Sequence, residues 1–557
     1  MKPHYTLNRF FLTLALIAGC IICRAQKPLE SLAANNVNAG IGIGGNLFSN
    51  TQSATQTFAH MEVPKGSGIS SFFTAALWIT ATDGNNNLKC AAQRYCGTGH
   101  DFFDGPIMGN YNAAYDTFFR RVFKITRLQV EHHATLAPNT MTIGDVDSAI
   151  LFWPAKGNSY IATSYGVNID NRLAPFIDAD GDGSYNPLKG DRPAICGNEA
   201  IFFVFNDARA AHGETGGAAL GIEVRGLAEV FVDSSFGGFN APPPAKRAIN
   251  NTVFVRYEIE NKSENPLFNL NVGMFADIDL GCFANDYVGC DTTRELIFAY
   301  NATPADNDCN GLLGYKTLDA STGIKRLNGS YSSFNYLING GTYNNDPITP
   351  EEYNNYLNAL WLDGIPFTVG GNGRPGSIPT KYIYPGNPSN FNDWTEKSAQ
   401  IQAGDRRMMG ASQLGNMPTG NIKVLEYAFI TSMDSSADNL TIVDTLKKDA
   451  DEIQAFYDNN LLPCRQGFQL PTAITETKQD KSLAFSVYPN PASSLLMVET
   501  SGMIELAEVR DMLGRMVLSQ KANTGKLLLD VSLLAKGVYL LKIESAGKTA
   551  VKRIVVE

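Results

Sequence analysis

Short alternations of apolar and polar residues, separated by turn residues, constrain the fold of this chain more than any other feature. Side chains of a β-strand point alternately to its two faces, so a strand with one buried face reads apolar at every second position. Residues 253–260 (VFVRYEIE) follow this pattern, and Arg256, Glu258 and Glu260 fall on the polar face. Comparable segments are 71–80 (SFFTAALWIT), 201–205 (IFFVF) and 424–430 (VLEYAFI). We therefore predict a mainly β protein built from antiparallel β-sandwiches.

The composition favours short strands and tight turns over disorder. The chain has 557 residues and 44% apolar content, which is enough for two or three domains with their own cores. Charged residues make up 18%, and glycine is frequent at 51 residues. The formal net charge is -10, and no basic tract is present to neutralise phosphates. The charge thus argues against nucleic-acid binding and fits a soluble outer surface.

Residues 1–25 have the layout of a secretory signal peptide. A positively charged start precedes an apolar run over residues 10–22, which is too short to span a membrane. Small residues at the critical positions predict cleavage between Ala25 and Gln26. The alternative is a lipoprotein signal, because residues 17–20 (IAGC) resemble a lipobox that would make Cys20 the lipidated residue. No later segment is apolar for long enough to cross a bilayer, so we expect no transmembrane segment in the mature chain.

Four regions are expected after the signal. Residues 26–240 and 241–462 form two β-rich regions, divided by a proline-rich break at residues 241–245 (APPPA). The second region ends in one amphipathic helix, whose apolar stripe consists of Val443, Leu446, Ala450, Ile453 and Phe456. A polar linker over residues 463–482 then leads to a C-terminal module, residues 483–557.

The C-terminal module contains a dense series of short strand patterns. These segments are 485–488, 495–500, 507–511, 516–519, 527–531, 538–544 and 549–556. So many short strands in so short a module predict a small Ig-like antiparallel β-sandwich. Such a module is close to the lower size limit for an independent hydrophobic core.

The landmarks of this module resemble the type A C-terminal sorting domain of the bacterial type IX secretion system. They are the segments 488–491 (YPNP), 511–515 (DMLGR), 534–539 (LAKGVY) and 552–556 (KRIVV), in the order typical of that family. The residues that carry the motif are Pro489, Asn490, Pro491, Gly514, Lys536, Gly537, Tyr539, Lys552 and Arg553. In physical terms, we expect the prolines to hold an extended entry, Gly514 and Gly537 to occupy turns with positive φ, and the basic last strand to present backbone and charge to a receptor.

This resemblance implies how the chain is handled by the cell. Sorting domains of this family are recognised by the outer-membrane translocon and cleaved near the linker by its sortase. The passenger is then released or attached to surface lipopolysaccharide. The resemblance therefore implies a secreted or cell-surface protein on the exterior of the outer membrane.

The body resembles a group of uncharacterised type IX cargo proteins over most of residues 35–460. The segments that carry this similarity are 63–68 (VPKGSG), 76–79 (ALWI), 101–106 (DFFDGP), 190–193 (GDRP), 203–207 (FVFND) and 286–291 (DYVGCD). This group has no known activity, so the similarity supports export and does not name a task.

An acidic loop matches the first half of a calcium-binding loop. Residues 178–185 (DADGDGSY) alternate aspartates with small residues, and Gly183 permits a sharp bend. The twelfth position of an EF-hand loop is Lys189 here, and Asp191 can supply the missing carboxylate. Crowded carboxylates repel one another unless a cation lies between them. The predicted calcium ligands are Asp178, Asp180, Asp182, Ser184 and Asp191. We expect this calcium to brace a long loop; the alternative is a solvated Asp–Gly turn.

A second acidic set surrounds two of the seven cysteines that follow the signal. Its members are Asp277, Asp279, Asp286 and Asp291, which form a weaker candidate metal site near Cys282 and Cys290. An exported chain can keep disulfides. Cys90–Cys96 and Cys282–Cys290 are close enough in sequence to form local pairs, although sequence alone does not fix the pairing.

The sequence offers no established catalytic motif. Neither HExxH nor GxSxG occurs, and His212 lies near Glu214 in a glycine-rich stretch where a histidine is more often structural than catalytic. We therefore assign no catalytic residue. A non-enzymatic surface or adhesive protein is the favoured function, and a secreted hydrolase acting on polysaccharide or protein is the alternative.

Overall fold

The chain forms two compact units in the computed structural model, residues 1–470 and residues 471–557. We call them the body and the C-terminal unit. The structure describes residues 29–49, 61–94, 99–109, 111–232, 248–304, 320–434, 436–467, 485–510, 516–545 and 548–557. The predicted signal with Cys20, Ala25 and Gln26, the break at 241–245, and Gly514 lie outside the described residues.

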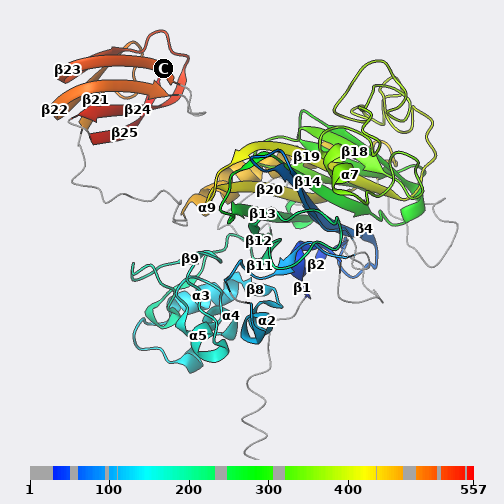
Figure 1. Ribbon diagram of the computed structural model, residues 1–557, viewed down its shortest axis with the longest axis horizontal. Helices are drawn as coiled ribbons and strands as arrows, with labels where there is room; N and C mark the ends of the chain where they lie inside the picture. The colour runs from blue at the N-terminus through cyan, green and yellow to red at the C-terminus, as the bar shows by residue number, and fades with distance from the viewer. Residues whose placement is uncertain are drawn as a thin grey trace, which may run out of the picture. The chain divides into compact units, whose positions relative to one another are not determined.

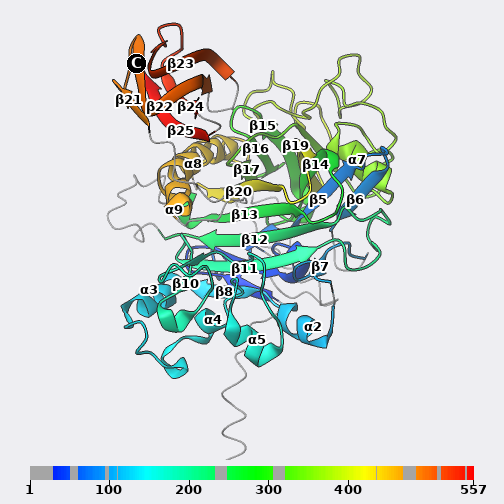
Figure 2. The same cartoon turned by 60° about the vertical axis from the view of Figure 1, so that its left-hand side comes forward.

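One large antiparallel sheet forms the centre of the body (Figures 1 and 2). Its strands, in spatial order, are β15 (Asp286–Asp291), β16 (Leu296–Asn301), β17 (Ala320–Arg326), β20 (Ile422–Met433), β13 (Thr252–Asn261), β12 (Ile222–Val230), β11 (Glu199–Asn206) and β7 (Phe103–Asp104), with β8 (Phe123–Thr126) also paired to β11. The segment 253–260 lies in β13, where Val253, Val255 and Tyr257 are buried as the alternation predicts. Phe254 and Glu258 on the opposite face are buried as well, so the strand is covered on both faces and not on one as expected.

A second antiparallel sheet packs against one face of the large sheet. Its strands are β18 (Ser333–Leu337), β19 (Arg406–Met417), β14 (Leu267–Ile278), β5 (Thr74–Thr82) and β6 (Leu88–Ala92), beside a small sheet of β1 (Leu29–Leu32), β2 (Asn38–Gly42), β3 (Met61–Glu62) and β4 (Ser70–Phe72). Side chains of both sheets, such as Phe203, Val255 and Trp78, share one hydrophobic core. The body is therefore a β-sandwich, as the sequence predicts.

Helices cover the other face of the large sheet at its two ends. Figure 1 shows α2 (Ala113–Phe119), α3 (Arg127–Thr135), α4 (Ser148–Leu151) and α5 (Ser159–Tyr165) near β8 and β11. Phe202 and Val204 of β11 point into this helical layer, whereas Phe203 and Phe205 point into the sandwich. This double burial explains why residues 201–205 are continuously apolar. The two-stranded ribbon of β9 (Phe176–Ile177) and β10 (Arg192–Pro193) lies on the same side of the large sheet as these helices.

The late amphipathic helix is confirmed as α8 (Ile442–Phe456), whose predicted stripe is buried against the large sheet. The helical path continues beyond α8 through Asn459 and Asn460. A π-helical turn, Tyr457–Leu461, leads directly into α9 (Leu462–Gly467). The first residues of the predicted linker, 463–467, are thus helical and belong to the body, because Leu461 and Arg465 are buried in it.

The predicted division of the body at residues 240 and 241 is not visible as two separate cores. Strand β12 pairs with β13, and β5 pairs with β14, so each of the two main sheets contains strands from both regions. Long-range pairing of this kind leaves no signal in the local sequence pattern, whereas a proline-rich segment does.

The C-terminal unit is a small antiparallel β fold with its own core. Its strands are β21 (Phe485–Tyr488), β22 (Leu495–Arg510), β23 (Met516–Asp530), β24 (Gly537–Ser545) and β25 (Lys548–Val556). The seven predicted segments form five strands, because residues 495–500 and 507–510 belong to β22, while 516–519 and 527–530 belong to β23. Register shifts between Glu499 and Leu506 mark the irregular middle of β22, where the sequence alternation breaks.

Candidate functional site

The YPNP motif closes the fold of the C-terminal unit. The side-chain amide of Asn490 donates to the carbonyl of Arg553 (3.1 Å), and its oxygen accepts from the backbone N–H of Val555 (2.8 Å). The backbone N–H of Ala492 donates to the carbonyl of Val555, and that of Glu557 donates to the carbonyl of Ala492 (both 2.9 Å). Pro489 and Pro491 flank Asn490 in a bend, not in the extended entry that we expected, and the peptide bonds Tyr488–Pro489 and Asn490–Pro491 are cis. This motif therefore ties the entry of the unit to its last strand.

The remaining motif residues lie on the last two strands and the turn before them. The Tyr539 hydroxyl donates to the carbonyl of Ala535 (2.6 Å), which fixes the turn that contains Lys536. Lys552 and Arg553 are exposed on β25, which is an edge strand of its sheet. Gly537 begins β24 without the positive φ that we expected, so its role is not that of a left-handed turn residue.

The acidic loop brings three of its five predicted ligands together. Asp178, Asp180 and Asp191 each offer a carboxylate oxygen, and these oxygens lie within 4.8 Å of one another. Asp191 is fully buried and accepts from the backbone N–H groups of Ala179 and Asn186 (both 2.7 Å). Burial raises the pKa of Asp191, and the charges of Asp178 and Asp180 add to this rise against those hydrogen bonds.

The other two predicted ligands lie outside this group. Asp182 binds the ammonium of Lys189 (2.8 Å), which also binds Asp180 (2.8 Å), and the Ser184 N–H donates to Asp182 (2.8 Å). The cation at the twelfth position of the loop is thus the ammonium of Lys189. A bound metal ion would compete with this ammonium for the carboxylate of Asp180. The loop continues into Tyr185, whose hydroxyl donates to the carbonyl of Ile150 in α4 (2.7 Å).

In the described part of the chain, the carboxylates of the second acidic set do not form one cluster. The carboxylate of Asp291 pairs with Arg294 (3.0 Å), and Asp277 lies 3.9 Å from Arg407. Asp286 is buried at the start of β15. Burial raises the pKa of Asp279 to about 7, and the nearby charge of Asp405 contributes to this rise. Asp279 therefore lies near Asp405, a carboxylate that was not among the four residues of the predicted site.

His212 and Glu214 belong to a buried network instead of an open site. Both ring nitrogens of His212 lie 2.8 Å from backbone carbonyl oxygens, those of Cys90 and Asp207. Glu214 accepts from Arg94 and from the Tyr353 hydroxyl (2.9 Å). These contacts hold the 207–217 segment against the second sheet, which is the structural role that we expected for this histidine.

Residues 486–557 match the family model described as secretion system C-terminal sorting domain. The C-terminal unit is a type IX sorting domain. This match covers the same segment on which the YPNP-to-KRIVV motifs lie. A chain with this sorting domain is handled by the type IX secretion system and is exported to the cell surface or secreted. In the described part of the chain, no helix is long and apolar enough to cross a membrane.

No curated protein matches the chain. Two solved structures show remote likeness. A polysaccharide lyase has 9% identity and a TM-score of 0.18, with 70% of this chain and 43% of the lyase covered. PorZ, a surface component of the type-IX secretion system of Porphyromonas gingivalis, has 10% identity and a TM-score of 0.12, with 95% and 75% covered. The chain spans less than half of the lyase, and TM-scores this low carry no argument about fold or function.

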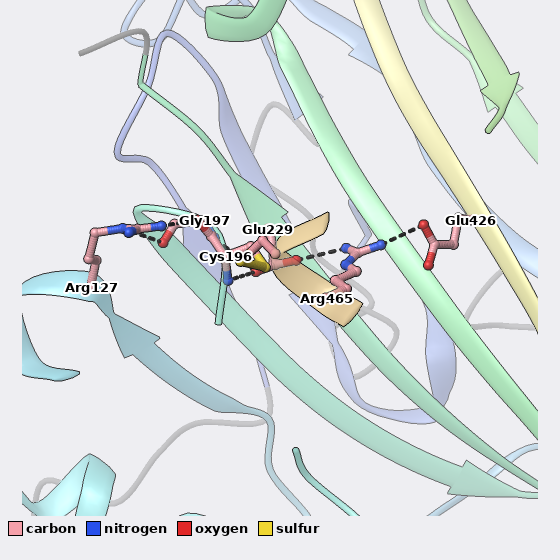
Figure 3. The surroundings of a disulfide bond; sticks show 7 residues. Arg127, Cys196, Gly197, Glu229, Glu426 and Arg465 are labelled. Carbon is pink, nitrogen blue, oxygen red and sulfur yellow. Dashed lines mark hydrogen bonds and ion pairs between the residues drawn. A yellow bond between two sulfur atoms is a disulfide. The ribbon is translucent and has the colours of Figure 1, made fainter. Parts of the chain in front are cut away.

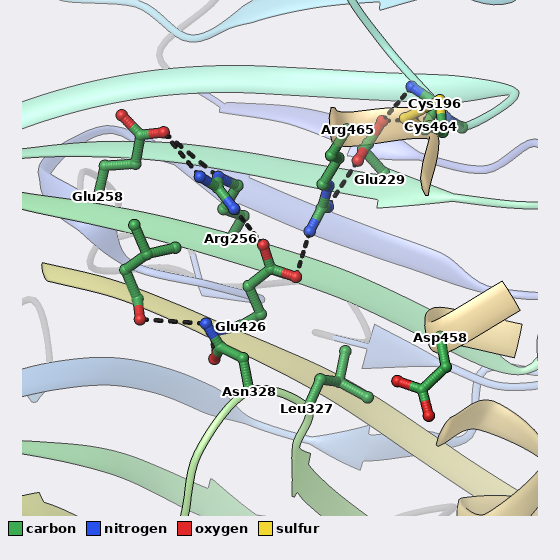
Figure 4. Close-up of polar contacts among 12 residues, drawn as sticks. Cys196, Glu229, Arg256, Glu258, Leu327, Asn328, Glu426, Asp458, Cys464 and Arg465 are labelled. Carbon is green, nitrogen blue, oxygen red and sulfur yellow. Dashed lines mark hydrogen bonds and ion pairs between the residues drawn. A yellow bond between two sulfur atoms is a disulfide. The ribbon is translucent and has the colours of Figure 1, made fainter. Parts of the chain in front are cut away.

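A disulfide anchors the end of the body just before the sorting domain begins. Cys464 of α9 is bonded to Cys196, which precedes β11 (Figure 3 shows the surroundings of this bond, and Figure 4 labels both cysteines). Cys90 and Cys290 are free and buried, and Cys282 is disulfide-bonded, so the local pairs Cys90–Cys96 and Cys282–Cys290 are wrong. The observed bond joins residues 268 positions apart, which sequence spacing could not reveal.

A buried chain of ion pairs surrounds this disulfide (Figures 3 and 4). The guanidinium of Arg465 donates to Glu229 (2.7 Å) and lies 2.7 Å from Glu426. Glu426 also pairs with Arg256, which donates to Glu258 (3.0 Å). Burial lowers the pKa of Arg465, but the carboxylates of Glu426 and Glu229 outweigh this effect and raise it overall. Arg465 is thus a charged group that fixes α9 to the large sheet.

Proposed function

We propose that this chain is a structural or adhesive protein of the cell surface or the medium, delivered by its type A sorting domain. The observation that supports this proposal is that the body is a β-sandwich with its own core. A disulfide at Cys464 and buried ion pairs at Arg465 fix the end of this sandwich. The C-terminal unit, which follows in the sequence, is folded separately. A passenger of this kind can keep its fold when the sorting domain is removed. We propose further that the translocon recognises the sorting domain, that its sortase cleaves between the two units, and that the passenger is then released or attached to lipopolysaccharide.

Deletion of residues 486–557 tests the export proposal. Because the body has its own core, the shortened chain is expected to fold but to remain inside the cell or the periplasm. The measurement is immunodetection of the body in cell, outer-membrane and culture fractions. The full chain and the exposed body variant Gln413→Ala serve as controls and should both reach the exterior. Unchanged export of the shortened chain would refute the proposal.

We also propose that calcium binds in the acidic loop and braces the helical layer of the body. Asp178, Asp180 and Asp191 would supply carboxylate oxygens, and Tyr185 would transmit the bracing to α4. With an extracellular-type Kd of about 10⁻⁴–10⁻³ M, calcium at about 10 mM would stabilise the fold by about 1.4–2.7 kcal/mol.

Thermal unfolding with calcium and with a chelator tests this site. Calcium should raise the Tm of the wild type, Asp178→Asn should remove the rise, and Lys189→Gln should strengthen it because the competing ammonium is gone. Asp363→Asn, which lies outside the loop, is the control. A Tm that does not respond to calcium in the wild type would contradict the proposal.

The second candidate function is hydrolysis of polysaccharide or protein. One observation favours it: burial raises the pKa of Asp279 to about 7, and the charge of nearby Asp405 adds to this rise, so Asp279 can hold a proton near neutral pH. A carboxyl with a raised pKa is what glycoside hydrolysis requires of its general acid.

A further inference from the structure

The long connection between two neighbouring strands forms a distinctive surface of the body. Strands β18 and β19 pair directly, with Ser333 opposite Ala411 and Leu337 opposite Arg407, yet residues 338–405 separate them in the chain. The one α-helix in this connection is α7 (Pro350–Leu357). Connections of this length inside a compact domain usually serve binding or catalysis.

The two ends of this connection enclose a pocket of about 500 Å³. Tyr336 and residues 338–344 line one side, residues 401–406 line the other, and Asn372 contributes from the middle of the connection. Because β18 and β19 are adjacent in the sheet, the pairing of these strands holds both walls in place. This volume lies within the range of small-molecule sites and would hold one or two sugar rings.

The aromatic part of the wall is rigid. Tyr336 is 2% exposed, and its ring meets Trp361 edge to face at 6.0 Å. Tyr343 contacts the same tryptophan at 5.1 Å, and the guanidinium of Arg374 lies over the Tyr343 ring. Packed tyrosines of this kind offer apolar ring edges beside polar groups, which suits a ligand with both C–H and O–H surfaces.

The polar part of the wall is organised by Asp405. The amide of Asn339 donates to Asp405 Oδ2 (2.6 Å), and Arg407 donates to the Asn339 oxygen (2.7 Å) and to Asp405 Oδ2 (3.3 Å). The other oxygen, Asp405 Oδ1, is buried and has no hydrogen-bond partner among the described residues. The contacts of Asp405 Oδ2 and Arg407 thus fix the Asn339 amide at the pocket wall.

The charges around the pocket are already balanced. The two charged lining residues are Asp405, which is paired with Arg407, and Arg406, which is paired with Glu396 (2.7 Å). An anionic or cationic ligand would find no unpaired opposite charge among these groups. Side-chain amides such as Gln402 and Asn339 both donate and accept, which matches hydroxyl groups.

From this combination of tyrosine edges, side-chain amides and paired charges, we propose that the pocket between residues 336–344 and 401–406 binds a neutral saccharide unit. The inference rests on the proposed adhesive role and names its ligand class. Binding can be measured on purified full-length chain, so a failure here is distinguishable from a failure of export.

Calorimetric titration of the full chain with neutral gluco-, manno-, galacto- and xylo-oligosaccharides tests the proposal. At least one neutral series should bind, and Gln402→Ala or Asn339→Ala should each weaken binding about tenfold, as expected for the loss of one hydrogen bond of about 1.4 kcal/mol. Gln413→Ala, an exposed amide outside the pocket, should leave the Kd unchanged. Gln402 is itself exposed, so its replacement should preserve the Tm and keep the test valid.

Three outcomes would overturn the inference. The first is that no neutral oligosaccharide binds. The second is that binding survives in both pocket variants. The third is that only an anionic probe such as oligogalacturonate, or only an unrelated peptide, binds in a manner that Gln402→Ala weakens.

Discussion

Replacement of Arg465 by methionine is expected to destabilise the body by about 3 kcal/mol, because it leaves buried carboxylates without their cation. Glu229 and Glu426 are 0% and 1% exposed, and both approach the guanidinium to 2.7 Å (Figure 4). Loss of one partner of a buried ion pair typically costs about 3–5 kcal/mol. We expect the lower end of this range, for reasons that the structure supplies.

Both carboxylates keep other partners in this variant. Glu229 still accepts from the backbone N–H groups of Cys196 (2.7 Å) and Gly197 (2.9 Å). Glu426 still pairs with Arg256. These contacts offset part of the desolvation cost, because a buried charge that keeps hydrogen bonds or an ion pair costs less free energy than one without partners.

Urea unfolding measures this effect. The double variant Arg465→Met with Glu229→Gln should recover part of the lost stability, because one of the two uncompensated charges is removed. The control is Asp451→Asn, which removes an exposed pair with Arg294: the Asp451 side chain is 54% exposed, and its loss should cost below about 1 kcal/mol. An Arg465→Met midpoint equal to that of the wild type would show that α9 is not fixed by these ion pairs.

Loss of the Cys196–Cys464 disulfide is the second prediction with a large effect. The double variant Cys196→Ala with Cys464→Ala should lose about 2–5 kcal/mol, because a bond across a long loop restricts the unfolded chain. The substitution removes the covalent bond between the segment before β11 and α9. The same effect should follow in the wild type when a thiol reductant is present during unfolding.

A comparison under oxidising and reducing conditions separates the disulfide from packing effects. In the wild type the unfolding midpoint should fall when reductant is added. In the double variant a smaller fall should remain, since Cys282 is also disulfide-bonded. The control is Cys90→Ala, a free buried thiol whose removal costs only packing. Equal midpoints for the double variant and the wild type without reductant would contradict this prediction.

Local patterns in the sequence predicted the elements that depend on local physics. The alternation in residues 253–260 indicated a strand with one apolar face, and the stripe from Val443 to Phe456 indicated α8, because both patterns follow directly from side-chain periodicity. The sorting domain was predictable from its resemblance to a known family, since each of its motifs is a short continuous segment, and one of them contains the turn closed by Tyr539.

The features that the sequence did not reveal all depend on distant residues. Cys196 meets Cys464, and Arg465 meets Glu229, only because the large sheet brings β11, β12 and α9 together. Short helices such as α4 and α5 bury few side chains of their own and so lack a helical stripe long enough to recognise. In the acidic loop, the sequence indicated a cluster of carboxylates, but only the structure showed that Lys189 lies between Asp180 and Asp182.

Transfer of the C-terminal segment to a foreign passenger tests the central claim most directly. Residues 468–557 are fused to a periplasmic reporter, in the wild-type form and with Leu541→Asp, which places a charge in the sorting-domain core where Leu541 is 0% exposed. The account predicts that the wild-type fusion reaches the cell surface or the medium while the Leu541→Asp fusion is retained with the unfused reporter. Retention of the wild-type fusion, or equal export of all three proteins, would show that this fold is not the signal for export.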